Sequence, residues 1–164
     1  MPSRIIDLLQ WINDTALADS VRNSDWLFPA FETVHVVAIV IVVGAITRLD
    51  LRLAGLVWRN RPVTEVSNEM LPWTWIAFGV AVLSGLVLFA SKPMQYLAMA
   101  FFDVKMVLIM LAGANMLFFQ HVIFKSINRW DRDPIPPVAA QVAGSLSLAF
   151  WVSVVICGRL IGFV

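Results

Sequence analysis

The sequence predicts an all-α fold class: an integral membrane four-helix bundle with an N-terminal amphipathic interfacial helix. The chain of 164 residues is 60% hydrophobic and only 14% charged, with a mean hydropathy of +0.81. A soluble domain has roughly 45–50% apolar and about 25% charged residues. The chain also contains several separate apolar runs of about 20 residues, the length that an α-helix needs to cross a bilayer.

The chain divides into an N-terminal segment, residues 1–26, and a single membrane domain, residues 27–164. Apolar residues of the N-terminal segment recur every three or four positions between aspartates. This pattern predicts one amphipathic helix over about 2–22, lying on the membrane surface, with an ordinary surface helix as the alternative. The membrane spans are expected at about 28–48, 71–91, 101–123 and 138–163.

The connections between the spans are short and contain helix-breaking prolines. Pro62, Pro93 and the stretch 133–137 are placed outside the spans, because proline rarely occupies a helix interior. Lys and Arg are more frequent on the two connections that share one side. The positive-inside rule therefore predicts that both termini lie outside. The positive residues of the inner side are Arg48, Arg52, Arg59, Arg61, Lys125, Arg129 and Arg132.

Several function classes lose support from the sequence alone. The net charge of +1 and the lack of a basic stripe do not favour nucleic-acid binding. A single cysteine, Cys157, cannot form an intrachain disulfide. The loops contain no phosphate-binding loop and no nucleophile–base arrangement. Whether the protein is an enzyme stays open, because intramembrane enzymes can work with few polar residues.

Ionisable side chains at membrane depth are costly, so each one is a functional hypothesis. A helix rise of about 1.5 Å per residue places Glu32 and Lys105 in the outer half of the membrane. They are expected to form an ion pair between the first and third spans, or to take part in a proton relay with His35. Asn115 lies near the midplane. It is expected to form a hydrogen bond between helices or to take part in the same proton relay.

His35 lies one helical turn deeper than Glu32, at the depth of Ser84, and Met110 approaches that depth. Neutral imidazole binds haem iron, copper or zinc, and a thioether can join it. The alternatives are that His35 is a structural histidine, hydrogen-bonded within the bundle, and that Met110 serves packing. His121, the second histidine, should lie about 17 Å away in depth, so one haem cannot readily use both. Each histidine would then need methionine or a second copy of the chain to supply the other ligand of the iron, or the iron would be five-coordinate.

Arg48 and Arg52 flank Asp50 at the inner edge of the first span. Guanidinium groups pair well with carboxylates, so these arginines could hold haem propionates that face inward. An anionic lipid headgroup would suit them equally. The alternative is a charge cluster that pairs locally and sets the topology. The candidate cofactor-binding residues are His35, His121, Met110, Arg48 and Arg52, with the two histidines as metal ligands.

Two stretches, FETVHVVAIVIVVGAITRLDLRLAG and KMVLIMLAGANMLFFQH, carry a family resemblance. They resemble a family of small four-span bacterial inner-membrane proteins of unknown function. More distantly, the layout is similar to that of membrane b-type cytochromes and of the membrane domain of copper-resistance proteins. The chain lacks the two histidine pairs that hold two haems in the cytochrome b561 pattern. The residues that carry the closer resemblance are Glu32, His35, the tail 48–53, Lys105, Asn115 and His121.

Three functions follow as expectations. The first is a redox or electron-transfer protein that binds haem b. The second is a copper-handling or other metal-handling protein. The third is an accessory subunit without chemistry of its own, which forms a homo-oligomer or joins a larger membrane complex. Small residues at four-residue spacing, Ala77, Ala81 and Gly85, would let helix backbones approach closely within the bundle or between copies.

Overall fold

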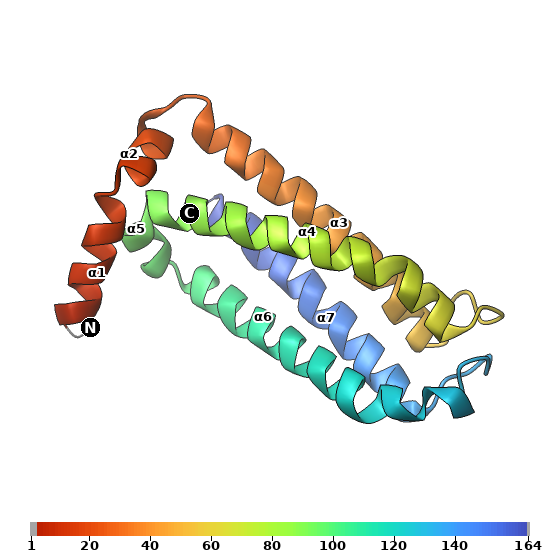
Figure 1. Cartoon of the computed structure of the whole chain (residues 1–164). Coiled ribbons are helices and arrows are strands. Elements are labelled where there is room, and N and C mark those ends of the chain that lie inside the picture. Colours follow the sequence, from red (N-terminus) through yellow and green to blue (C-terminus); the bar gives the residue numbers. More distant parts are fainter. Residues whose placement is uncertain (1–2, 164) are drawn as a thin grey trace.

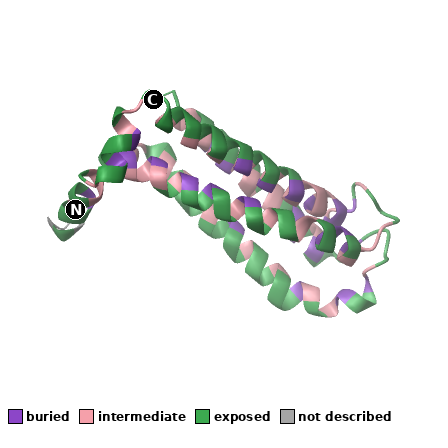
Figure 2. Ribbon diagram, turned by 45° about the horizontal axis from the view of Figure 1, so that its top comes forward, coloured by how far each residue is buried: buried purple, intermediate pink, exposed green. Residues whose placement is uncertain are grey.

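The computed structural model describes residues 3–163, and its regular elements over that range are all helical. Four helical stretches are long and apolar enough to cross a membrane, which confirms the fold class and makes this a multi-pass membrane protein. Their residues contact the bilayer, since most of the large apolar side chains on the spans are exposed (Figure 2). The four stretches are α3 (Leu27–Leu53), α4 (Val63–Ser91), Ala100–Arg129, which begins with α6 (Ala100–Phe118), and α7 (Val138–Ile161).

The four long helices form two hairpins (Figure 1). α3 packs along α4, α6 packs along α7, and the hairpins meet where α3 packs on α7. Both chain ends lie at one end of the assembly, which we call the terminal end, together with the short α5 (Pro93–Leu97). The two connections, 54–62 and 130–137, lie at the opposite end, which we call the loop end.

The N-terminal segment forms two helices, α1 (Ser3–Asn13) and α2 (Ala16–Asn23), so the prediction of one continuous helix over 2–22 was wrong. Thr15 separates them. Its hydroxyl donates to the Ile12 carbonyl at 2.8 Å and accepts from the Ala18 N–H at 3.3 Å. Because its side chain caps the start of the second helix, Thr15 ends the first helix instead of continuing it.

The helix α4 begins at Val63, eight residues before the predicted start at 71. Its first turn is capped from the other connection: the Val63 N–H donates to the Asp131 carbonyl at 3.0 Å, and the Thr64 N–H donates to the Asp131 carboxylate at 2.8 Å. An external carboxylate can cap these otherwise unpaired N–H groups as a local side chain would. Pro72 consequently lies inside the helix, whereas Pro62, Pro93 and the stretch 133–137 lie outside the four spans, as predicted.

Buried side chains gather at the loop end, where the two connections close over the helix ends (Figure 2). Gly144 of α7 lets α3 approach closely, because a Cβ added there would lie 2.8 Å from the Asp50 carbonyl oxygen. Along α4, Ala77 and Ala81 are buried, as the small-residue spacing predicted for packing within the bundle. The core cluster at the loop end consists of Leu53, Val63, Ile123, Ile127, Trp130, Ala140 and Ala143.

Candidate functional site

His35 is held by α4 through its Nδ1 atom. This atom lies 2.9 Å from the Ala81 carbonyl oxygen and 3.1 Å from Ser84 Oγ. Because a carbonyl oxygen only accepts, Nδ1 carries the hydrogen and donates it. A neutral ring with a hydrogen on Nδ1 keeps a lone pair on Nε2. The arrangement fixes the orientation of the imidazole and leaves Nε2 as the atom that can bind a ligand.

Gly85 makes room for the His35 ring. A Cβ at this position would lie 3.0 Å from His35 Cε1, closer than side chains normally approach. Ser84 was expected at the depth of His35, and the hydrogen bond between them agrees with that. A contact between Gly85 and the histidine was not predicted. The signal was the small-residue spacing of α4, which we interpreted as helix packing alone.

Lys105 of α6 is half-buried and reaches toward α7. Its Nζ lies 3.7 Å from the position that a Cβ on Gly158 would occupy. Among residues 3–163, Lys105 forms no hydrogen bond and no ion pair within 4.0 Å of a carboxylate.

Glu32 is exposed at the start of α3 and does not form the expected ion pair with Lys105 in the described part of the chain. Burial, and then the Glu32 charge, raise the pKa of the Tyr96 phenol. A relay through Glu32 stays a prediction. Tyr96 is a polar neighbour of this region that the sequence analysis did not include.

The other candidate ligands lie elsewhere. Met110 is 64% exposed on α6, so its thioether faces the lipid side of the helix. His121 is exposed in the π-helical turn η1 (Phe119–Ile123), near the loop end, and its Nδ1 lies 3.0 Å from the Leu117 carbonyl oxygen. The two histidines therefore lie toward opposite ends of the bundle, as the depth estimate predicted.

The charged residues at the end of α3 bind the connections. Arg52 is 0% exposed, and it donates from Nε to the Arg61 carbonyl at 2.8 Å and from Nη2 to the Asp133 carbonyl at 2.9 Å. Arg48 pairs with Glu69 at 3.7 Å and stacks over the Trp58 ring. The structure does not bring either arginine to His35. Their assignment to propionates stays a prediction, while local pairing is what the contacts show.

Two further polar residues have clear structural partners. Asn115 donates from Nδ2 to the Ala143 carbonyl at 2.9 Å, which joins α6 to α7 as an interhelical hydrogen bond. Asp50 is 5% exposed and faces Ser147 of α7, and its Oδ2 atom has no hydrogen-bond partner in the described chain. Full burial of Asp50 and Arg52 was not predicted, because their sequence positions suggested a solvated membrane edge.

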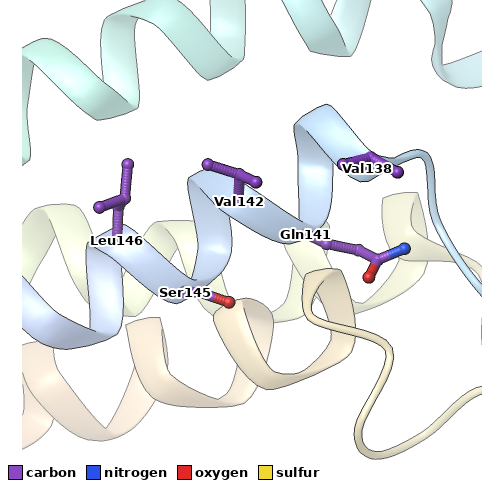
Figure 3. Close-up of a pocket in the computed structure, with 5 residues that line it drawn as sticks. All are labelled: Val138, Gln141, Val142, Ser145 and Leu146. Atoms are coloured by element: carbon purple, nitrogen blue, oxygen red, sulfur yellow. The ribbon is translucent and has the colours of Figure 1, made fainter.

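A shallow hollow on one face of α7 lies apart from His35 (Figure 3). It is mainly apolar, and Gln141 at its edge already donates to the Pro136 carbonyl at 2.7 Å. Over residues 3–163, no three His, Cys, Asp or Glu side chains gather closely enough to hold a metal ion. The best candidate site is the region around His35, whose imidazole is held in one orientation by α4. The hollow is lined by Val138, Gln141, Val142, Ser145 and Leu146.

Comparison with known proteins gives a family but no activity. Residues 9–164 match a family model described as "Family of unknown function (DUF6644)". No curated protein and no solved structure matches the chain. The family match covers the membrane domain and most of the N-terminal segment, in agreement with the resemblance seen in the sequence. The chain therefore belongs to this family of unknown function, as a multi-pass membrane protein.

Proposed function

We propose that the protein binds haem b in the membrane and transfers electrons, with His35 as the axial ligand. The observation that carries the proposal is the hydrogen bond from His35 Nδ1 to the Ala81 carbonyl at 2.9 Å. Histidines that bind metals usually donate their second ring N–H to a carbonyl or carboxylate, which fixes the tautomer and increases the basicity of the ligating nitrogen. His35 has this arrangement, with Nε2 left to bind iron.

The donor set fits haem better than copper. A copper ion needs several protein ligands, and no three His, Cys, Asp or Glu side chains gather in the described residues. Haem brings four nitrogens of its own and needs only one or two from the protein. His121 lies near the loop end and Met110 faces outward, so neither of these two candidate ligands joins His35. We infer that His35 would hold the haem, alone or with a residue of a second copy.

Each residue of the site would have a limited task. A bound haem supplies the one-electron chemistry. Ala81 and Ser84 hold the imidazole ring, and Gly85 leaves it space. The exposed apolar side chains around the helices exclude water by facing lipid.

The test compares the two histidines as a matched pair. The wild type, His35→Ala and His121→Ala are purified from their own membrane, and their Soret absorption and haem content are measured. We expect a Soret band in the wild type and in His121→Ala, and its loss in His35→Ala. A colourless, iron-free wild type would contradict the proposal. Copper analysis of the same samples tests the metal-handling alternative.

We also propose that the loop end faces the cytoplasm of a bacterial inner membrane and that both termini lie outside. The support is the Lys and Arg excess on the two connections. A C-terminal alkaline phosphatase fusion should be active and a C-terminal green fluorescent protein fusion dark. The reverse pattern would overturn this orientation.

An accessory role in an oligomer or a larger complex is the second candidate. It is favoured by the mainly apolar hollow on α7 in Figure 3, whose lining includes the small exposed side chain of Ser145, where another helix would be able to approach. Replacing Ser145 by Leu should then dissociate the oligomer, as measured by light scattering in detergent. A wild type that is already a monomer would remove this candidate.

A further inference from the structure

Asp50 places a carboxyl group between membrane helices without a cation beside it. It lies in the last turn of α3 and is 5% exposed. Its Oδ2 atom is buried and has no hydrogen-bond partner among residues 3–163. No lysine, arginine or histidine of that range lies within 4.0 Å of its carboxyl oxygens. An ionised carboxylate in such a place would carry a large desolvation cost that no partner offsets.

The neighbouring helix α7 offers this carboxyl a hydroxyl group but no opposite charge. α3 packs on α7, and a Cβ added at Gly144 would lie 2.8 Å from the Asp50 carbonyl oxygen. Ser147 lies three residues after Gly144, on the same side of α7, and faces Asp50. α7 contains no carboxylate, and its one basic residue, Arg159, lies about four turns beyond Gly144.

The charged groups around the end of α3 have other partners. Arg52 donates to carbonyls of both connections, and Arg48 pairs with Glu69. Both arginines lie two positions from Asp50, and residues two apart on a helix do not face each other. The remaining charged groups of the packed helix α4 and of the two connections, each exposed or bound to another partner, are Arg59, Arg61, Glu65, Asp131, Arg132 and Asp133.

We propose that Asp50 is a proton-binding site, and that its neutral carboxyl forms part of the contact between α3 and α7 at neutral pH. A buried carboxylate without a cation avoids the cost of its charge by taking up a proton. A proton, unlike a metal ion or a larger ligand, needs no cavity. The protonated carboxyl also gains an O–H donor, which the Ser147 hydroxyl or a helix carbonyl can accept.

The proposal couples the proton to the packing of the two hairpins. Separation of α3 from α7 would expose Asp50 to water, and the carboxyl would then release its proton to the solvent. Ionisable groups inside membrane proteins commonly belong to paths along which protons or ions move. The inference is independent of the haem proposal, because it uses neither His35 nor any cofactor.

Infrared spectroscopy of the full chain in lipid nanodiscs tests for the proton, because a protonated carboxyl and a carboxylate absorb at different frequencies. At neutral pH the wild type should show the C=O band of a protonated carboxyl, and Asp50→Asn should lose it. Asp133→Asn is the matched control and should keep the band, since Asp133 is exposed at the same end. Labelling the aspartate side chains with a heavy carbon isotope should shift the band in the wild type, which makes the assignment independent of how well a variant folds.

Several results would overturn the proton site. These are a wild type without the band, a band that the isotope does not shift, a band that survives in Asp50→Asn, and a band that disappears in Asp133→Asn.

The pH dependence of unfolding tests the coupling to the helix contact. A carboxyl that keeps its proton when folded and loses it when unfolded makes the fold less stable as the pH rises. This loss begins at about pH 4, where aspartate in water ionises, and ends where the folded carboxyl ionises. Over that range the unfolding equilibrium constant of the wild type should rise by about tenfold per pH unit relative to Asp50→Asn. Equal slopes for the two proteins would overturn the coupling.

Discussion

The loop end and the region around His35 use polar residues in opposite ways. At the loop end, Arg52 donates to carbonyls of both connections, and Asp131 caps the first turn of α4. Around His35, one ring nitrogen has no hydrogen-bond partner in the described chain. The polar groups of the first region hold helices and loops together. The second leaves a ring nitrogen that a ligand can use.

The apolar packing follows the same division. The buried core cluster lies at the loop end, whereas the middle of each span carries exposed side chains suited to lipid. A fold stabilised mainly at one end can leave the other open to binding, because binding regions are often the less stable parts of a protein. Substitutions at the loop end should therefore affect stability, and those near His35 should affect ligand binding.

The largest expected effect is at Arg52. Replacing it by Ala removes the charged donor of two partly buried hydrogen bonds, to the Arg61 and Asp133 carbonyls. Each such loss costs about 1–3 kcal/mol, so the free energy of unfolding should fall by about 2–6 kcal/mol. Arg59→Ala is the control, since Arg59 is exposed and donates locally to the Gly55 carbonyl. Equal SDS-unfolding curves for the two variants would contradict a role for Arg52 in joining the connections.

A smaller loss is expected at Gly144, where α3 and α7 approach. A Cβ there would lie 2.8 Å from the Asp50 carbonyl oxygen and 2.9 Å from Leu53 Cβ. Backbone atoms cannot move aside freely, so Gly144→Ala should destabilise the fold by about 1–3 kcal/mol. Gly113→Ala is the matched control, because nothing lies within 4 Å of its added Cβ. If both variants melt at the same temperature, α3 and α7 are not packed this closely.

The smallest effect on stability is expected at Gly85, beside His35. The added Cβ of Gly85→Ala would lie 3.0 Å from His35 Cε1, and a side chain can turn away. Alanine also favours the helix by about 1 kcal/mol, so the net change in unfolding free energy should be within about 1 kcal/mol.

The haem content of Gly85→Ala, measured by its Soret band, should nevertheless fall, because the imidazole loses its orientation. Gly79→Ala on the same helix has open space and should keep its haem. A variant with normal haem and lowered stability would mean that Gly85 serves packing, like Gly144.

The fold was largely predictable from the sequence, since apolar length decides which segments span a bilayer. Among the site residues, the grouping of His35 with Ser84 followed from helix rise and was found. The ion pair between Glu32 and Lys105 was expected from depth alone and is not formed in the described chain. Depth does not specify which face of a helix a side chain occupies, or which neighbour it meets.

The sequence by itself determined the membrane class, the number of spans and the separation of the two histidines, because these depend on hydropathy and on distance along a helix. The tertiary structure alone decided the start of α4, the burial of Arg52 and the tautomer of His35. Each of these depends on a partner distant in sequence: Asp131, the two connections and the Ala81 carbonyl. Such contacts are set by how the helices pack, which local sequence patterns do not encode.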